Sequence, residues 1–312
     1  MSGEFAALSA VILFVIVSGL QSATPIMLAA TGGAFSAQVN VFNVALEALL
    51  LGSAFTSFCA AHVTGNVWIG LLVGILTGVV LAAIFAFLTV TLGGNEIIIG
   101  FGMNIAVTGL TAVLLGSLFN SPGSFLSPTA GSFPMIYSKI GWLTLVALLL
   151  VAVAHWHTFH TRAGLRMRAI GFDSSAALAA GIRVDAYKYR AVIMGGALCG
   201  IGGAVIPLSG LSLFSVAMTA GMGFIAIAAV ILADGRPILA GAAALFFGFT
   251  SAIGIQLQAF GWPNELVLAL PYVATVLALL VKAIIGLRRE AKRRTRQADQ
   301  GQITTTNIEV VA

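Results

Sequence analysis

The stretch HTRAGLRMRAIG, residues 160–171, is a basic island between two long apolar runs. It continues through Asp173 and Gly181 to Arg190, and the flanking runs are residues 140–160 and 189–208. A helix needs about 20 apolar residues to cross the hydrocarbon core of a bilayer, and each run has that length. The island is therefore predicted to be a loop at a membrane surface that joins two spanning helices.

The composition extends this prediction to the whole chain. Of the 312 residues, 59% are hydrophobic and only 8% are charged, and residues 1–138 contain no Lys or Arg. A water-soluble protein would need charges spread over its surface to cover so much apolar material. We expect an all-α, polytopic membrane protein, because a helix satisfies its own backbone hydrogen bonds in lipid.

Nine apolar runs are predicted to be membrane helices. They are residues 5–30, 43–61, 67–92, 97–119, 140–160, 189–208, 218–233, 238–257 and 265–285. The first run contains Thr24-Pro25 and is followed by Gly32-Gly33, and these residue types interrupt helices. If they divide residues 5–39 into two short elements, the count is ten.

Basic residues set the expected orientation, because loops rich in Lys and Arg stay in the cytoplasm. The central loop, residues 161–189, and the tail, residues 288–312, are both basic. We therefore expect both in the cytoplasm, with residues 120–138 outside. Nine spans would leave the N-terminus outside, and ten would place it inside. The loops expected on the cytoplasmic side with the basic island are residues 32–42, 93–96 and 234–237.

The tail differs in composition from the rest of the chain. Residues 288–312 are basic at first and then polar and rich in Thr, without an apolar period. Such a segment is predicted to be disordered. Its basic start would attract anionic headgroups of the lipid bilayer, and no binding of nucleic acid is expected. Residues 1–287 would then form one transmembrane domain.

Few polar side chains fall within the predicted spans. The candidates for a translocation path or a helix interface are Asn43, Glu47, Glu96 and Asn104. An ionisable residue inside a membrane is a functional candidate, because burying a charge there costs about 3 kcal/mol or more. The alternative for Glu47 is a hydrogen bond to a neighbouring helix or loop, and for Glu96 it is helix capping beside Asn95. Neutral groups also line the predicted path, and they favour an uncharged polar cargo over an ion: Asn43, Ser53, Asn104 and Thr108.

The chain lacks the sequence motifs of enzymes and of self-powered pumps. It has no phosphate-binding loop, nucleophile elbow or zinc-helix motif. The imidazoles of His155, His157 and His160 lack the i, i+4 spacing that binds zinc, so no metal or cofactor is expected. No relay of acidic residues for proton coupling is visible. An external energy source is favoured, with a self-contained secondary transporter or a channel as the alternative.

Two stretches of the first half resemble a known family. Residues 43–52, NVALEALLLG, look like a signature near the start of ABC importer permeases of the ribose, nucleoside and branched-chain amino-acid type. Residues 95–100, NEIIIG, followed by Asn104, resemble a second signature, that of the sugar and nucleoside branch. The first match departs from the family at Ala45 and Ala48, where a Gly is common.

The basic island carries the most specific resemblance. Residues 161–171, followed by Ala176-Ala177 and Gly181-Ile182, are similar to the cytoplasmic loop of the sugar and nucleoside branch. Gly235-Arg236-Pro237 resembles an inner turn of the family in shortened form. In all, the resemblance covers residues 23–285.

The family resemblance implies a permease subunit with the helix bundle of type II ABC importers. Two such subunits, identical or paralogous, would form a pore in the inner membrane that carries a simple sugar or a nucleoside by alternating access. Separate cytoplasmic ATPase subunits would bind the ATP and drive transport. An extracytoplasmic binding protein would deliver the solute.

The resemblance also implies that the basic island couples the permease to the ATPase. The residues carried over are Arg162, Gly164, Arg166, Arg168, Gly171, Asp173, Ala176, Ala177 and Gly181. A short helix within residues 173–181, with Asp173 as its N-cap, would enter a cleft of the ATPase through a close-packing face of Ala176, Ala177 and Ala180. The alternative is a solvated loop that only sets the topology.

Overall fold

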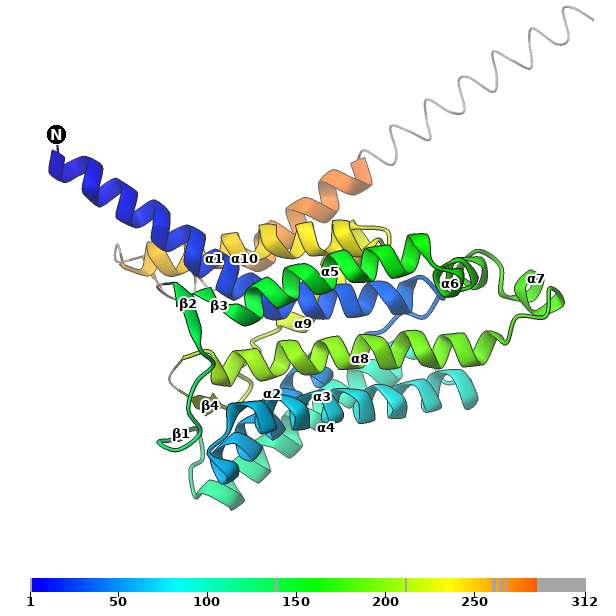
Figure 1. The fold of residues 1–312 in the computed structure, drawn as a ribbon, viewed down its shortest axis with the longest axis horizontal. Coiled ribbons are helices and arrows are strands. Elements are labelled where there is room, and N and C mark those ends of the chain that lie inside the picture. The colour runs from blue at the N-terminus through cyan, green and yellow to red at the C-terminus, as the bar shows by residue number, and fades with distance from the viewer. Residues whose placement is uncertain are drawn as a thin grey trace, which may run out of the picture.

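The structure is a bundle of long, roughly antiparallel helices (Figure 1). This computed structural model describes residues 2–137, 140–210, 212–259, 262–263, 266–267 and 269–284. The long helices are α1 (Ser2–Ala37), α2 (Leu46–Thr64), α3 (Val67–Ala86) with its π-helical extension η1 (Phe87–Thr91), α4 (Glu96–Phe119), α5 (Trp142–His160), α8 (Val184–Leu208) and α10 (Pro237–Ala259). The shorter ones are α6 (Arg162–Phe172), α7 (Ser174–Ala179), α9 (Met222–Leu232) and a C-terminal helix, Ala269–Ile284.

Seven helices of the described part are long and apolar enough to cross a membrane. The sequence predicts nine to ten. α9 is shorter than a span, and the C-terminal helix is described only over Ala269–Ile284. At about 1.5 Å per residue, the 11 residues of α9 extend only about half the thickness of the hydrocarbon core. Glu265, the expected start of the last span, lies outside the described residues, as does the tail 288–312.

The first apolar run forms one continuous helix, so the expected division that would give ten spans is wrong. α1 continues through Pro25 and through Gly32-Gly33 to Ala37. A Cβ on Gly32 would lie 2.6 Å from the carbonyl oxygen of Gly195 on α8. The glycine therefore permits a close helix contact and does not break the helix.

The predicted span 218–233 is also wrong in its first turn. Residues 216–220 form turns, and Ala217, Ala220 and Gly221 have positive φ angles of 54°, 43° and 78°. α9 begins only at Met222. The apolar composition of this stretch conceals the break, because Ala and Met are not turn-forming residues.

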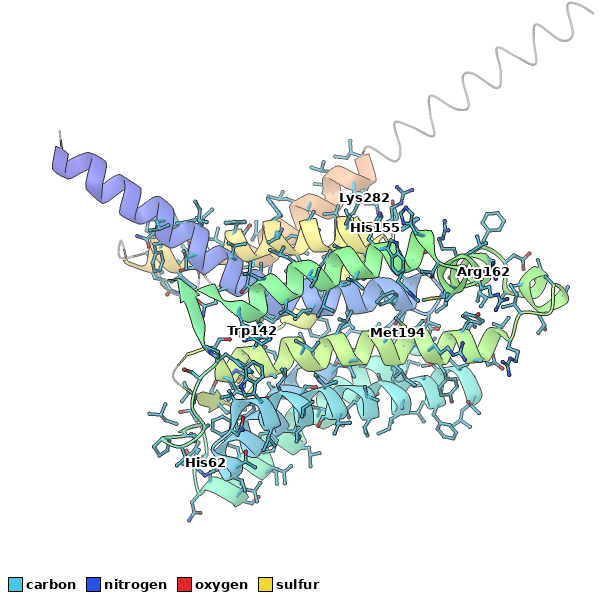
Figure 2. The ribbon with its side chains drawn as sticks, viewed as in Figure 1. His62, Trp142, His155, Arg162, Met194 and Lys282 are labelled. Atoms are coloured by element: carbon cyan, nitrogen blue, oxygen red, sulfur yellow. The ribbon has the colours of Figure 1, made fainter. Side chains whose placement is uncertain are left out.

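Two small sheets qualify the all-α prediction. β1 (Ser124–Leu126) pairs antiparallel with β4 (Leu213–Ser215), and β2 (Met135–Tyr137) pairs with β3 (Ile140–Gly141). Both sheets lie at the end of the bundle opposite α6 and α7 (Figure 1). Figure 2 places His62 and Trp142 toward the same end, and His62 Nδ1 lies 2.8 Å from Ser127 Oγ.

The core is built on close helix contacts. A Cβ on Gly78 of α3 would lie 2.3 Å from the carbonyl oxygen of Gly196 on α8. α8 also packs against α1 and α2, so it lies at the centre of the bundle. α4, by contrast, exposes large apolar side chains such as Ile98 and Ile105, 72% and 75% exposed. Such a surface suits lipid or a second membrane subunit.

The opposite end, which we call the basic end, contains α6, α7 and the turn before α10. Gln38 Nε2 donates to the carbonyl oxygen of Gly235 at 2.7 Å. Lys282 Nζ forms an ion pair of 2.5 Å with Asp234. The segments 32–42, 93–96, 161–189 and 234–237, predicted to share one side of the membrane, gather at one end of the molecule (Figure 1).

Candidate functional site

The start of α2 lies inside the protein. The linker from α1 to α2 carries Val39, Val41 and Val44 into the core, each at most 4% exposed. The first amide groups of a helix have no partner within the helix, and a buried start must find acceptors elsewhere. Polar side chains around α2 supply them.

Two asparagines support this helix start. Asn43 Oδ1 accepts a hydrogen bond of 3.0 Å from the amide of Ala45. Asn104, on α4, accepts 2.9 Å from the amide of Ala48 and donates 3.0 Å to the carbonyl oxygen of Val44. Asn104 therefore fixes the end of the linker and the first turn of α2 together. Asn43 Nδ2 is buried and has no hydrogen-bond partner among the residues described.

Glu47 joins the start of α2 to the start of α9. Its Oε2 accepts 2.7 Å from the amide of Gly223, and its Oε1 accepts 3.0 Å from the amide of Gly221 and 2.5 Å from the hydroxyl of Thr219. The residue is only 8% exposed. Because the amide end of a helix favours negative charge, this carboxylate is a cap for α9 supplied by another helix.

Glu96 binds the same linker from α4. Its Oε2 accepts a hydrogen bond of 2.5 Å from the amide of Phe42. The predicted N-cap Asn95 is confirmed, since its Oδ1 accepts from the amides of Ile97 and Ile98. Gly100 lets α4 come close, because a Cβ there would lie 2.6 Å from Val44 Cβ.

The four polar candidates from the sequence therefore meet at one place. We call it the α2–α9 junction, which consists of Asn43, Glu47, Glu96 and Asn104 with Thr219 and Gly223. Sequence reasoning missed Thr219 and Gly223. A Cβ on Gly223 would lie 2.4 Å from the backbone nitrogen of Glu47, so this glycine is required for the approach. The only signal in the sequence is a pair of glycines before an apolar run.

A cavity of about 440 Å³ lies beside the start of α9, between α1, α10 and the C-terminal helix. Its lining is mostly apolar, with the neutral polar side chains of Ser22, Ser251 and Gln258 among it. Ala220 and Met222 border the cavity, and the Tyr272 hydroxyl donates to the carbonyl oxygen of Ala220. This lining can form hydrogen bonds with an uncharged ligand.

At the basic end, α6 is held on the bundle by one face. The hydroxyl of Thr161 caps the helix by accepting 3.1 Å from the amide of Gly164. Gly164, Met167 and Ile170 form the buried face. A Cβ on Gly171 would lie 2.4 Å from the carbonyl oxygen of Gln38, so the end of α6 rests on the linker that leads to α2.

The arginines of α6 have different surroundings. Arg166 donates 3.0 Å to the hydroxyl of Tyr187, and the guanidinium of Arg168 lies 4.8 Å from the centre of the Phe159 ring. Arg162 is exposed, and Figure 2 places it at the basic end. Arg166 and Arg168 therefore anchor α6, and Arg162 contributes to a basic surface around it.

α7 stands beyond the ends of the long helices (Figure 1). It forms the helix predicted within residues 173–181, and Asp173 caps it by accepting 2.9 Å and 3.1 Å from the amides of Ser175 and Ala176. Hydrogen bonds from the Ser175 hydroxyl and from these amides lower the pKa of Asp173 below its ordinary value. Gly181 ends the segment with a φ of 79°, which suits glycine.

The exposed face of α7 differs from the expected one. Ala176 and Ala180 are exposed, but Ala177 is only 5% exposed and faces the chain itself. Ala177 therefore cannot belong to an outward face of small residues. Phe172 and Leu178, 95% and 65% exposed, project from the segment instead. The signal available in the sequence was their apolar character within a polar loop.

Comparison with known proteins identifies the family. Residues 15–279 match the family described as branched-chain amino acid transport system / permease component. The putative glucose ABC transporter permease protein TsgC13 of Haloferax volcanii is 34% identical over 253 residues, which are 77% of this chain and 76% of that protein.

Two further relatives are named as nucleoside permeases. The guanosine ABC transporter permease protein NupQ of Bacillus subtilis is 30% identical over 86% of this chain and 92% of its own length. The nucleoside ABC transporter permease protein NupC of Lactococcus lactis subsp. cremoris is 32% identical over 82% and 88%. These matches favour a transport subunit over an enzyme. They do not support the alternative of a self-contained transporter or channel. The chain belongs to the branched-chain amino acid transport system / permease component family and is a multi-pass membrane permease of an ABC transporter.

Proposed function

We propose that the chain is the membrane subunit of an ATP-driven importer for a neutral polar solute, a simple sugar or a nucleoside. The names of the glucose and nucleoside relatives support this solute class. So do the uncharged polar side chains of the cavity beside α9, Ser22, Ser251 and Gln258. A second permease subunit completes the pore, and a binding protein delivers the solute at the end with the two sheets.

The basic end faces the cytoplasm of the cell's inner membrane in this proposal, and the tail 288–312 lies on the same side. The concentration of arginines on α6 and at the start of α8 supports this orientation, because basic segments stay inside. Residues 1–287 then act as the transmembrane domain, with residues 161–189 as its cytoplasmic loop.

α7 is the contact with the ATPase. The observation that carries this step is the position of α7 beyond the bundle, with Phe172 and Leu178 exposed. Two large apolar side chains exposed close together on a polar segment favour burial against a protein partner. Ala176 lies on the exposed part of the helix, while Ala177 and Gly181 set its shape.

Contacts of α6 lead from α7 to the α2–α9 junction. Gly171 rests on Gln38, and Gln38 also binds Gly235 in the turn before α10. The linker that begins there ends at α2, where Glu47 holds α9. A displacement of α7 by the ATPase is transmitted along this linker, so that α9 moves relative to α2 and the path opens alternately to the two sides.

Replacing Leu178 with Asp tests the ATPase contact. In the complete complex reconstituted in liposomes, Leu178→Asp is expected to lower ATP-driven uptake at least tenfold, because the charge opposes burial against the ATPase. Leu178→Met keeps the side chain apolar and serves as the matched control, with uptake close to that of the original protein. Undiminished uptake in Leu178→Asp, at equal membrane levels, would exclude α7 as the contact.

The solute class needs a separate measurement. The binding protein that co-purifies with the complex is expected to bind glucose or a nucleoside, and the complex is expected to take up that solute only with ATP. Binding and uptake of charged amino acids alone would reject a neutral solute. Uptake by the permease without any ATPase would reject the importer itself.

A further inference from the structure

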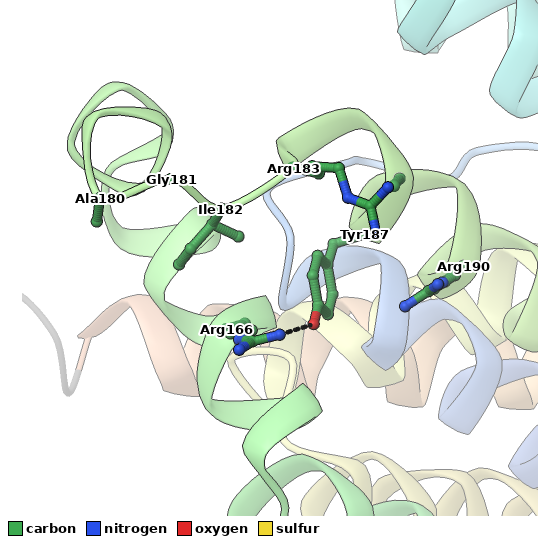
Figure 3. Close-up of a pocket in the computed structure, with 8 residues that line it drawn as sticks. Arg166, Ala180, Gly181, Ile182, Arg183, Tyr187 and Arg190 are labelled. Carbon is green, nitrogen blue, oxygen red and sulfur yellow. Dashed lines mark hydrogen bonds between the residues drawn. The ribbon is translucent and has the colours of Figure 1, made fainter.

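A basic pocket lies between α6, the turn after α7 and the start of α8. Its volume is about 260 Å³, and its lining includes Arg166, Arg183, Tyr187 and Arg190. Figure 3 shows the three arginine side chains around the ring of Tyr187. Arg166 donates to the Tyr187 hydroxyl at 3.0 Å, and the guanidinium of Arg190 lies 5.5 Å from the ring centre. The tyrosine therefore helps to hold both arginines in place.

The pocket has positive charge and no counter-charge. Across the part of the chain that the structure describes, the ion pair present is Lys282 with Asp234, and none of the three arginines takes part in one. Three guanidinium groups that line one cavity without a carboxylate in its lining fit an anion with several oxygens, above all a phosphate group.

An apolar groove continues from the pocket toward the middle of the bundle. Tyr187 and Arg190 also line a second cavity of about 310 Å³, which His157 and Met194 share with a third cavity of about 370 Å³. The third cavity lies between α5 and α8, both of which pack on α1, and Phe35 of α1 is part of its lining. Each cavity thus shares lining residues with the next, and the lining changes from basic at the first to mostly apolar at the third.

We propose that this series of cavities binds an anionic phospholipid, with the phosphate in the pocket of Arg166, Arg183 and Arg190 and an acyl chain in the groove between α5 and α8. The arginines of the pocket match the charged headgroup of the lipid, and the apolar lining of the groove matches its acyl chain. Trp156, which lines the third cavity and is 60% exposed, is a residue type enriched at membrane interfaces. An acidic side chain of another protein would satisfy the arginines but would leave the groove empty.

Lipid titration of the purified, delipidated complex tests the headgroup contact. Native mass spectrometry is expected to detect tight binding of phosphatidylglycerol and much weaker binding of phosphatidylcholine. Arg183→Gln and Arg190→Gln should each weaken phosphatidylglycerol binding about fivefold, the effect of one basic residue near an anionic lipid. Lys188→Gln, which removes a charge from the same helix but lines neither cavity, is the matched control and should leave binding unchanged.

A variant of the groove separates the lipid from other anions. Ala197 lines the third cavity, so the larger side chain of Ala197→Phe should fill it. Binding of phosphatidylglycerol should weaken about tenfold, while the affinity of the pocket for inorganic phosphate should stay the same. Equal binding of phosphatidylglycerol in Ala197→Phe, with inorganic phosphate as an effective competitor, would show a free phosphate site and overturn the proposal. Loss of the ATPase from the Arg183→Gln complex with unaltered lipid binding would assign the pocket to an acidic group of the ATPase instead.

Discussion

The carboxylate of Glu47 accepts a hydrogen bond of 2.7 Å from the amide of Gly223, 176 positions further along the chain. Glu47 belongs to the first turn of α2 and Gly223 to the first turn of α9, so two buried helix starts face each other. The Glu47 carboxylate accepts from amides at the start of α9 that α9 cannot satisfy itself, while Asn43 and Asn104 serve the start of α2. This contact makes the short helix α9 possible within the protein.

Glu47→Ala should therefore destabilise the complex strongly. It leaves the donors of Gly221, Gly223 and Thr219 without their acceptor, at about 1–3 kcal/mol for each buried group. Thermal unfolding of the complex in detergent should show a fall in Tm of several degrees and a loss of uptake. Glu47→Gln keeps one carbonyl oxygen as an acceptor, so its Tm should lie between those of Glu47→Ala and the original protein. Equal Tm values for Glu47→Ala and the original protein would contradict a capping role.

Gly223→Ala tests the close approach at the same contact without removing a hydrogen-bonding group. A Cβ there would lie 2.4 Å from Glu47 N and 2.5 Å from Glu47 Cα, which are backbone atoms that cannot turn aside. We expect α9 to be displaced, with a loss of stability of about 1–3 kcal/mol as in other overpacked sites. Gly102→Ala is the control, because a Cβ at Gly102 meets no atom within 4 Å. A Gly223→Ala protein as stable as Gly102→Ala would reject the close contact.

The cap of α7 should depend on pH. The pKa of Asp173 is lowered by hydrogen bonds from the Ser175 hydroxyl and from the amides of Ala176 and Ser175. A lowered pKa in the folded state means that the stabilisation is complete above the ordinary pKa and is lost as the pH falls through the lowered one. Hydrogen exchange of the peptide covering residues 173–181, corrected for intrinsic rates, should show weaker protection at about pH 3 than at pH 6.

Variants of Asp173 separate the cap from the charge. Asp173→Ala removes the acceptor, so exchange at Ser175 and Ala176 should be fast at every pH. Asp173→Asn keeps an oxygen that accepts the same hydrogen bonds, so protection should persist and lose its dependence on pH. Identical exchange in all three proteins would mean that the side chain does not hold α7.

The local features of the fold could be predicted from the sequence because neighbouring residues determine them. Asp173 and Asn95 lie directly before the amides that they cap, so composition and spacing are sufficient. The apolar runs likewise locate the long helices, since a lipid environment demands length and apolar character.

Features that depend on contacts between distant segments could not be predicted in the same way. No periodicity indicates that Glu47 meets Gly223, or that residues 216–220 form turns. Whether Pro25 breaks α1 depends on the helices around it. The inward position of Ala177 depends on how α7 packs on α6 and α8, and a segment of six residues gives too little pattern to reveal it.

The ion pair between Lys282 and Asp234 should contribute far less than the contact of Glu47. The two atoms lie 2.5 Å apart, but the side chains are 31% and 77% exposed, and exposed pairs contribute about 0–1 kcal/mol. Asp234→Asn removes the pair while tolerating the positive φ of 50° at this position, because Asn adopts this conformation readily. It should lower Tm by about one degree at low salt and leave Tm unchanged at high salt, where the pair is screened.

Lys282→Gln also removes the hydrogen bond to the carbonyl oxygen of Ile231, so its effect should be larger and should persist in salt. If Asp234→Asn destabilised the complex as much as Glu47→Ala, the ion pair would be a principal tie between the C-terminal helix and the basic end.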